Sequence, residues 1–529
     1  CGNGGKSNSG QTQAVSTETG STDAGASETT AASVSEDAGL HNLEDGVLDI
    51  GTGITWDTLT PLRSNVGNNA PFAMAAYETL ARLTENKEYV PQVAKSWVAG
   101  EDGKTFDVEI YDYVTDSAGN AITASDIVWM IKLQQEAALK PAFAKVESVE
   151  QTGDYTLRIT MKKDMVGAFE AILTNTFVVS QKAYEESKDQ FATEIISTSP
   201  YKVTEFVSGS VLSFEKRDDY WQKPELIPEE TAANVDKLSF HVIKEASQAG
   251  IALETGDIDA FVQLDQNTAV QFVDNPAFSM EANSYINGYQ LYFSGGDNRN
   301  IATDENLRKA ICYAIDTDGL IKGVFAGYGK SMHDPIADTS VGYLEKWKDE
   351  EYYPYDVEKA KELISQSNYK GEELEFLATS SSTTQRICQM IQGYLLQVGI
   401  NVKLNLVDQA LYTATRLDGT QYDMTINTVG GETLPDHWSI RYDYQAYKTG
   451  DATARHDEAL GELLYKTWTK EGFTEENIDE VHNYLKDHMY AYGMVQPENI
   501  DVWRTDLGIT KTVHTNKGSI DFTSCQYQE

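Results

Sequence analysis

Residues 197–221 read STSPYKVTEFVSGSVLSFEKRDDYW, and this stretch decides the fold that we predict. Its part from 201 to 221, YKVTEFVSGSVLSFEKRDDYW, contains on both sides of a Ser-Gly-Ser the β-branched and aromatic residues that are typical of strands. The Ser-Gly-Ser at 208–210 is typical of a tight turn between two strands. The stretch is therefore predicted to be a β-hairpin.

Strands and helices alternate along the rest of the chain. Residues 47–56, VLDIGTGITW, are predicted to form a strand, and residues 70–83 have the apolar spacing of a helix. Further helices are predicted over 122–139, with Thr123 as the N-cap, and over 306–325, with a break. This alternation predicts an α/β architecture.

Composition limits the classes of function that are open to the chain. Its 529 residues, 40% of them hydrophobic, are enough for a large core and predict two or more lobes. The 42 basic and 82 acidic residues leave a formal charge of −40, with the acids spread along the chain. Such a charge argues against binding nucleic acid or adhering electrostatically to an anionic membrane. No apolar run is as long as the roughly 18 residues of a membrane-spanning helix.

The cysteines beyond the first residue predict neither a disulfide scaffold nor a zinc site. Cys312, Cys388 and Cys525 show no CxxC or Cys/His spacing. Cys312 and Cys388 fall in apolar helical patterns, so we expect buried, inert thiols there. Neither a metal nor a cofactor is predicted.

The start of the chain has its own composition. Cys1 is followed by residues 2–45, which are mostly Ser, Thr, Gly and Ala. Because this segment has almost nothing apolar to bury, we expect a flexible tether. A cysteine at the tip of a tether has no partner, and a free exposed thiol is a liability. We therefore expect Cys1 to carry a lipid anchor with two acyl chains; the alternative is that the chain merely begins at this cysteine.

Six segments of the chain form a pattern by their order and spacing. Besides 197–221, they are PQVAKSW…DGKTF at 91–106, GNAITASDI at 119–127, ALETGDID at 252–259, LRKAICYAIDTDGL at 307–320 and VGINVKL at 398–404. Together they resemble the extracytoplasmic solute-binding proteins of ABC-type peptide importers, the oligopeptide- and dipeptide-binding proteins of family 5. The resemblance covers nearly all of 47–529, and in the 197–221 segment Ser197 and Ser199 stand where the family usually has glycines.

The resemblance implies a type II periplasmic-binding-protein-like fold, in which two α/β lobes joined by a hinge close on a ligand. The first lobe carries an extra subdomain, and the second carries the loop that sets ligand selectivity. The implied ranges are the tether at 1–45, lobe one at 46–73, 195–280 and 492–529, the extra subdomain at 74–194, and lobe two at 281–491.

The resemblance also implies a function. We expect a monomeric, lipid-anchored receptor on the outer face of the cell membrane that captures a peptide and delivers it to a permease. ATPase subunits of that transporter would hydrolyse ATP, and a long lipid-anchored tether favours a Gram-positive cell. The alternative ligands for the same role are an oligosaccharide, a nickel chelate or an opine. The chain has no nucleophile elbow, phosphate-binding glycine loop or HExxH motif, so no enzyme activity is predicted.

In relatives that bind peptides, an aspartate of lobe two pairs with the α-amino group of the peptide. Placing the family's proline at Pro435 puts that aspartate at Gly431 of this chain. The amine-binding carboxylate is therefore Glu432 or Asp436, or it is absent. The aromatic rings in the same loop would also offer faces to a sugar. The ligand-contacting residues assigned to this loop are Thr428, Val429, Gly430, Glu432, Asp436, Trp438 and Tyr442.

A second cleft segment is expected at 63–72, RSNVGNNAPF. In relatives the equivalent backbone runs beside the peptide and binds it as an added strand. Asn65, Val66 and Gly67 would do so through main-chain hydrogen bonds, without regard to side chains. The alternative is a polar surface loop.

Overall fold

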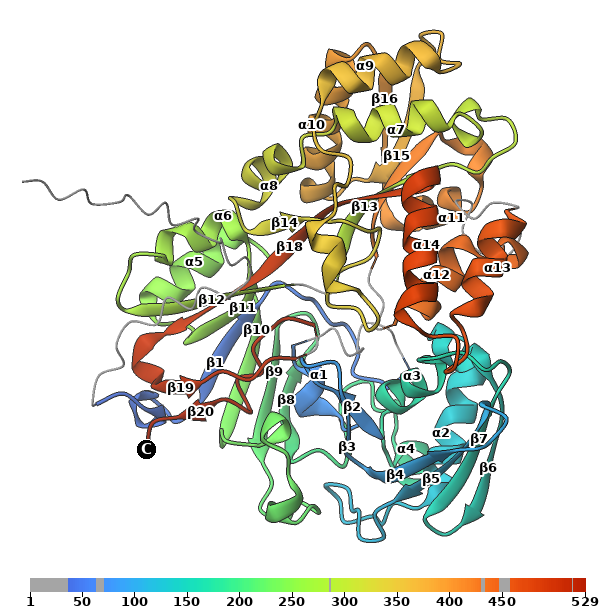
Figure 1. Cartoon of the computed structure of the whole chain (residues 1–529). Helices are drawn as coiled ribbons and strands as arrows, with labels where there is room; N and C mark the ends of the chain where they lie inside the picture. Colours follow the sequence, from blue (N-terminus) through green and yellow to red (C-terminus); the bar gives the residue numbers. More distant parts are fainter. Residues whose placement is uncertain (1–36, 63–70, 285–286, 430–432, 447–456, 516) are drawn as a thin grey trace, which may run out of the picture.

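Strand β18 (Ala491–Arg504) crosses from one lobe to the other in the computed structural model of the chain (Figure 1). On the side of lobe two it pairs with β13 (Gly288–Phe293) and β14 (Gly329–Ser331). On the side of lobe one it pairs with β11 (Ala260–Leu264) and β12 (Phe278–Ser284). The structure describes residues 37–62, 71–284, 287–429, 433–446, 457–515 and 517–529.

Lobe two is a sheet covered by helices. From β13 the sheet continues through β17 (Met424–Val429) and β15 (Leu374–Thr379) to β16 (Val402–Val407). The β15 pairs are parallel, as expected where helices connect successive strands. The helices are α7 (Glu305–Ala314), α8 (Thr317–Phe325), α9 (Val357–Gln366), α10 (Ser382–Gln397), α11 (Gln409–Arg416), α12 (Leu434–Tyr442), α13 (Glu458–Lys466) and α14 (Glu475–His488).

Lobe one contains the predicted hairpin. Strands β8 (Tyr201–Val207) and β9 (Val211–Lys216) pair antiparallel, with Val207 opposite Val211, which confirms the hairpin within 197–221. β1 (Leu48–Thr52) lies between β11 and β10 (Lys237–Val242), parallel to both. The remaining elements are α1 (Ala73–Ala76), α5 (Ala246–Thr255), α6 (Gln266–Ala269), β19 (Ile509–Lys511) and β20 (Gln526–Tyr527). The sheet through both lobes has 12 strands, in the order β16-β15-β17-β13-β18-β11-β1-β10-β9-β8, with β12 and β14 also on β18.

The segment 74–194 folds around a sheet of its own. Four antiparallel strands lie in the order β4-β5-β7-β6, and a short β2–β3 hairpin precedes them. In Figure 1 this part lies below α12, α13 and α14 of lobe two. The elements are β2 (Ala81–Leu83), β3 (Tyr89–Pro91), β4 (Ala94–Ala99), β5 (Thr105–Ile110), β6 (Val146–Gly153), β7 (Thr156–Met161), α2 (Ala124–Ala137), α3 (Ala168–Asn175) and α4 (Gln181–Glu186).

Separate hydrophobic cores hold these parts together. The core of lobe two includes Leu291 and Phe376, both fully buried. The extra subdomain has a core around Ile127. The core of lobe one also takes in Phe177 and Tyr184 of the extra subdomain. The subdomain is therefore attached to lobe one by shared apolar packing.

The helix predicted over 70–83 is wrong for most of its length. Only α1 is helical, and the chain turns into extended backbone at Tyr77. The peptide N–H of Leu80 donates to the carbonyl of Leu173 at 3.1 Å, so the second half of the segment pairs with α3 instead of continuing the helix. A short apolar run is compatible with a buried helix and with a buried strand. In this segment, hydrogen bonds to other parts of the fold determine which of the two forms.

The other two predicted helices are confirmed. α2 begins after Thr123, whose peptide N–H donates to Asp126 Oδ2 at 2.8 Å. The break predicted within 306–325 lies at Ile315, between α7 and α8. The Asp316 carboxylate accepts from Gly319 N at 2.9 Å and so restarts the helix.

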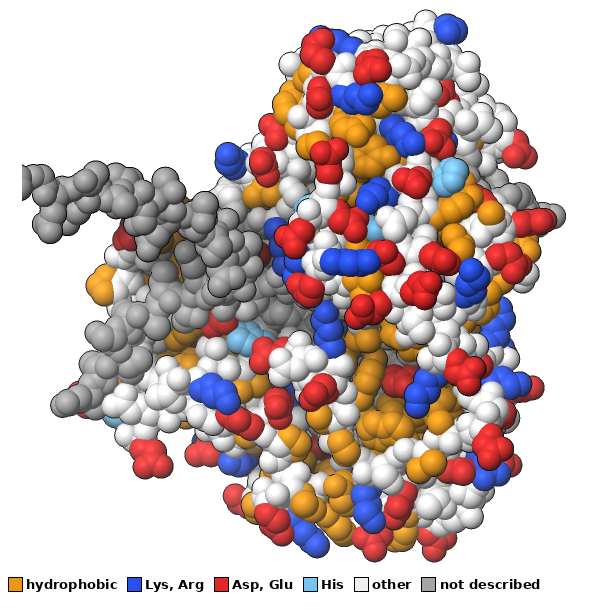
Figure 2. Space-filling view, in the orientation of Figure 1, with side chains coloured by type: hydrophobic (Ala, Val, Ile, Leu, Met, Phe, Trp, Pro, Cys, Tyr) orange, Lys and Arg blue, Asp and Glu red, His pale blue; other side chains and the backbone are white. Residues whose placement is uncertain are grey.

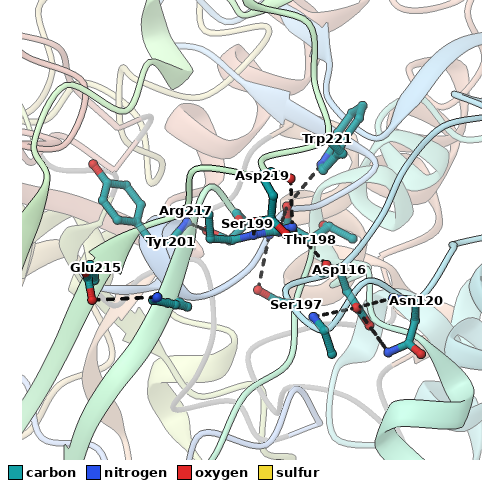
Figure 3. Close-up of polar contacts among 12 residues, drawn as sticks. Asp116, Asn120, Ser197, Thr198, Ser199, Tyr201, Glu215, Arg217, Asp219 and Trp221 are labelled. Atoms are coloured by element: carbon teal, nitrogen blue, oxygen red, sulfur yellow. Dashed lines mark hydrogen bonds and ion pairs between the residues drawn. The ribbon is translucent and has the colours of Figure 1, made fainter.

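The two serines that replace glycines at the start of 197–221 bond to the backbone of α1. The hydroxyl of Ser197 donates to the Ala76 carbonyl at 2.8 Å, and that of Ser199 to the Ala75 carbonyl at 2.6 Å. Beside them, buried Arg217 donates to Ser199 O at 3.0 Å and to Asp116 O at 2.9 Å (Figure 3). These bonds connect lobe one to the extra subdomain.

Candidate ligand-binding site

Lobe two and the extra subdomain meet along α3. The peptide N–H of Val166 donates to the Trp468 carbonyl at 2.6 Å. Gly167, the N-cap of α3, has φ +86°, and a Cβ added there would lie 2.3 Å from Thr433 Oγ1. Only glycine permits this close approach. Lys145 of the subdomain also forms an ion pair with Asp436 of α12.

A second contact lies near the strands that cross between the lobes. Asp338 of lobe two pairs with Lys330 at 2.6 Å and with Lys348 at 3.2 Å. Lys87, in the turn of the β2–β3 hairpin, donates to the Asp338 carbonyl at 3.1 Å. Lys330 also donates to Ser284 Oγ, at the end of β12, at 2.7 Å. Burial opposes ionisation of Asp338, but the lysines outweigh it and lower the pKa of this carboxyl.

The end of β17 holds two of the predicted site residues. Thr428 is exposed, and Val429 ends the strand. β17 pairs with β13 along its whole length but with β15 only at Met424 and Thr425. In the described part of the chain, no strand covers the other edge of residues 427–429. Backbone groups of this edge therefore have no strand partner among the described residues.

The structure places the other predicted residues differently. Asp436 already pairs with the ammonium group of Lys145. Trp438 and Tyr442 are 0% and 1% exposed and pack in an aromatic core with Trp347, so neither ring offers a face to a sugar. Trp438 and Tyr442 lie four residues apart in α12, and this helical spacing predicts that both rings lie on one buried face. Some of the predicted residues lie outside the part of the chain that the structure describes: Cys1, the tether through residue 36, Asn65, Val66, Gly67, Gly430 and Glu432.

The sequence analysis did not predict a small cavity between β2, α1 and α3, with a volume of about 30 Å³, which is room for about two water molecules. Its one charged residue is Arg82, whose side chain is 13% exposed. A lone arginine inside the apolar run AYETLARL was the available signal. The lining residues are Ala73, Met74, Tyr77, Thr79, Ala81, Arg82, Leu83, Gln92, Thr174 and Phe177.

A charge cluster centred on His514 lies between the β2–β3 hairpin and β12. His514 Nδ1 lies 2.9 Å from Glu85 Oε2, and its Nε2 lies 2.6 Å from Glu281 Oε1. Burial by itself lowers the pKa of His514, but the two carboxylates outweigh this effect and raise the pKa to about 10. The cluster joins the β2–β3 hairpin to β12 and to the C-terminal segment.

Two further findings concern the described residues. None of their helices is long and apolar enough to cross a membrane. Among them no group of three or more His, Cys, Asp or Glu side chains is arranged to hold a metal ion. On the face shown in Figure 2, acidic and basic side chains are interspersed and do not gather in one patch.

A two-lobed α/β fold whose lobes are joined by a crossing strand is typical of one class, the solute-binding proteins. The model of the bacterial extracellular solute-binding proteins, family 5, matches residues 88–451. The chain belongs to this family. It is therefore an extracytoplasmic binding protein of the ABC-transporter type, and not an enzyme.

Individual relatives are distant. The glutathione-binding protein GsiB of Pectobacterium atrosepticum is 24% identical over 380 residues, which are 69% of this chain and 70% of that protein. The ABC transporter substrate-binding protein CtaP of Listeria monocytogenes has a TM-score of 0.72 at 21% identity, over 87% of this chain and 94% of that one. NikA of Brucella suis, in complex with Fe(III)-EDTA, has a TM-score of 0.77 at 20% identity, over 91% and 99%. These structures confirm the two-lobed fold.

Proposed function

We propose that this protein captures a peptide between its lobes and delivers it to the permease of an ABC importer. The observation that carries the proposal is the edge of residues 427–429 of lobe two, which no strand of the described chain pairs with. An extended peptide adds to such an edge by main-chain hydrogen bonds, which give affinity without demanding a particular sequence. The relative GsiB is named for glutathione, itself a peptide.

The amine of the peptide needs a carboxylate partner in this proposal. Asp436 is engaged by Lys145, so we assign the role to Glu432, four residues earlier in the loop. Asn65, Val66 and Gly67 would bind the other side of the peptide through their backbone. The charge-assisted hydrogen bond of an amine to a carboxylate is about twice as strong as a neutral one.

The proposal includes a lipid anchor on Cys1, with residues 2–45 as the tether, on the outer face of a Gram-positive membrane. An anchor would hold a body of formal charge −40 near a membrane that its charge alone would not bind. Mass measurement of the protein extracted from membranes of its source tests this. We expect the mass of a diacylglyceryl group on Cys1, and release into the medium of a Cys1→Ala variant.

Native mass spectrometry of the Cys1→Ala chain, purified gently from rich medium, tests the ligand class. We expect a spread of bound masses that is lost on denaturation and that sequences as peptides. Masses spaced by one hexose would indicate an oligosaccharide, and a single mass carrying a metal would indicate a chelate; either result contradicts the peptide proposal. Glu432→Gln should then weaken peptide binding about tenfold or more, whereas Glu471→Gln, elsewhere in lobe two, should not.

A further inference from the structure

The extra subdomain is fixed to lobe one by buried contacts. Phe177 and Tyr184 of the subdomain belong to the hydrophobic core of lobe one. Trp221 of lobe one, which is 8% exposed, donates through Nε1 to Glu78 Oε2 of the subdomain at 2.9 Å, and Glu78 is 1% exposed. Separating the two parts would expose apolar surface and leave buried polar groups unpaired. We therefore expect the subdomain and lobe one to move as one body.

The contacts of the subdomain with lobe two are of a different kind. Lys145 forms an ion pair with Asp436 of α12, and both side chains are 28% exposed. The ammonium group of Lys163, on the surface, lies 4.6 Å from the centroid of the Trp468 ring. Ion pairs and cation–π contacts that solvent reaches are individually weak. They break without unfolding either part.

Trp468 is the residue of lobe two on which several of these contacts converge. Its carbonyl accepts from Val166 N at 2.6 Å, while its ring faces Lys163. On the side of lobe two the ring packs edge-on against Tyr465, with centroids 4.6 Å apart. The neighbouring Gly167 has no Cβ that would hold the two parts apart. An aromatic side chain that is supported within one part and contacted by the other is a typical anchor of a contact surface.

A third lysine of the subdomain also contacts lobe two. Lys87, in the turn of the β2–β3 hairpin, donates to the Asp338 carbonyl at 3.1 Å. Burial lowers the pKa of Lys87, and the nearby carboxylates Asp338 and Glu345 of lobe two oppose this effect. The boundary thus places the cations Lys87, Lys145 and Lys163 of the subdomain against carboxylates and an aromatic ring of lobe two. Such complementarity favours the approach of the two surfaces.

We propose that the extra subdomain is a clamp. It is carried by lobe one, contacts lobe two at Trp468 and Asp436, and holds the lobes closed over the bound solute. Hinge closure is the motion typical of two-lobed binding proteins. Contacts that exist only in the closed form stabilise that form alone, so the clamp slows the release of a solute whatever its chemistry. This role goes beyond the proposed function and does not depend on the solute being a peptide.

Distances between two spin labels test the clamp. The native cysteines of the described chain are buried, each 0% exposed, so in the Cys1→Ala chain the labels attach to introduced cysteines. Lys132→Cys on α2 and Glu476→Cys on α14 place one exposed label on each side of the boundary. Pulsed electron paramagnetic resonance of this labelled parent chain, as purified, should give one short distance at about 0.1 M salt. At about 1 M salt a longer distance should appear, because salt screens exposed charges.

The variant Lys145→Met/Lys163→Met removes two cations of the clamp and keeps most of the side-chain length. We expect the share of molecules with the longer distance to rise about tenfold over the labelled parent chain at low salt, from the loss of one ion pair and one cation–π contact. The matched control is Lys182→Met/Lys188→Met, two exposed lysines in and beside α4 of the same subdomain. This control should leave the distances unchanged.

Asp436→Asn tests the same boundary from lobe two and changes nothing in the subdomain, so the test remains if the double lysine variant does not fold. It should raise the share of the longer distance several-fold. Opening in either variant, with the control closed, supports the clamp. Distances in both variants that equal those of the control overturn the inference, and so does a labelled parent chain that is already open at low salt. The proposed function stands in either case, because it depends on the masses of the bound solutes.

Discussion

His514 shows how single residues hold parts of this fold together. Its ring lies between Glu85 of the extra subdomain and Glu281 of lobe one, and Glu281 is only 3% exposed. Replacing the ring leaves a buried carboxylate without its cation. We expect His514→Gln to lower the free energy of unfolding by about 3 kcal/mol, measured by denaturant titration at pH 7. The exposed His41→Gln is the control, and an equal effect of both changes would contradict this role.

The pH dependence of the same residue follows from its pKa. The pKa of His514 is about 10 in the fold, raised from 6.5 by the two carboxylates against the effect of burial. The stabilisation is complete below pH 6.5 and is lost as the pH rises toward 10. The difference in melting temperature between wild type and His514→Gln should therefore shrink from pH 6.5 to pH 10. A difference that stays constant over this range would exclude the ion pairs as its source.

At the scale of elements, the start of α2 joins two helices. Asp126 accepts from Thr123 N at 2.8 Å through Oδ2 and from Gln181 N, at the start of α4, at 2.8 Å through Oδ1. Asp126→Ala should therefore cost about 2 kcal/mol of stability, and Thr123→Ala about 1 kcal/mol. Equilibrium unfolding measures both, with Lys132→Ala on the exposed face of α2 as the control. Equal losses for the two variants would show that the contact with α4 contributes nothing.

Elements differ in how far the sequence predicts them. The 201–216 hairpin and the helices α2, α7 and α8 carry local signals, namely a turn or a cap at the right place. The 70–83 segment has no such signal beyond apolar spacing. Its second half forms β2 because it pairs with β3, and Leu80 before it donates to the carbonyl of Leu173 in α3. Spacing within one segment contains no information about that partner.

At the scale of the whole molecule, Gly167 controls how closely the extra subdomain approaches lobe two. A Cβ there would meet Thr433, so Gly167→Ala should force the contact apart and weaken ligand binding several-fold in titration calorimetry. Gly119→Ala is the matched control, since Gly119 also has positive φ, +81°, but nothing lies within 4 Å of its Cβ position. Both variants should lose about 1 kcal/mol of stability from backbone strain. Equal affinities would show that this contact does not contribute to closure.

The sequence by itself determined the α/β class, the hairpin and the family, because all three follow from local segments and from their order and spacing in the sequence. It also located the loop that ends at α12. Only the tertiary structure decided what each site residue can do. Trp438 and Tyr442 are core residues, Asp436 pairs with Lys145, and Arg82 pairs with Asp521 near the end of the chain. Burial and pairing depend on contacts between residues that are far apart in sequence, so no local pattern could have shown them.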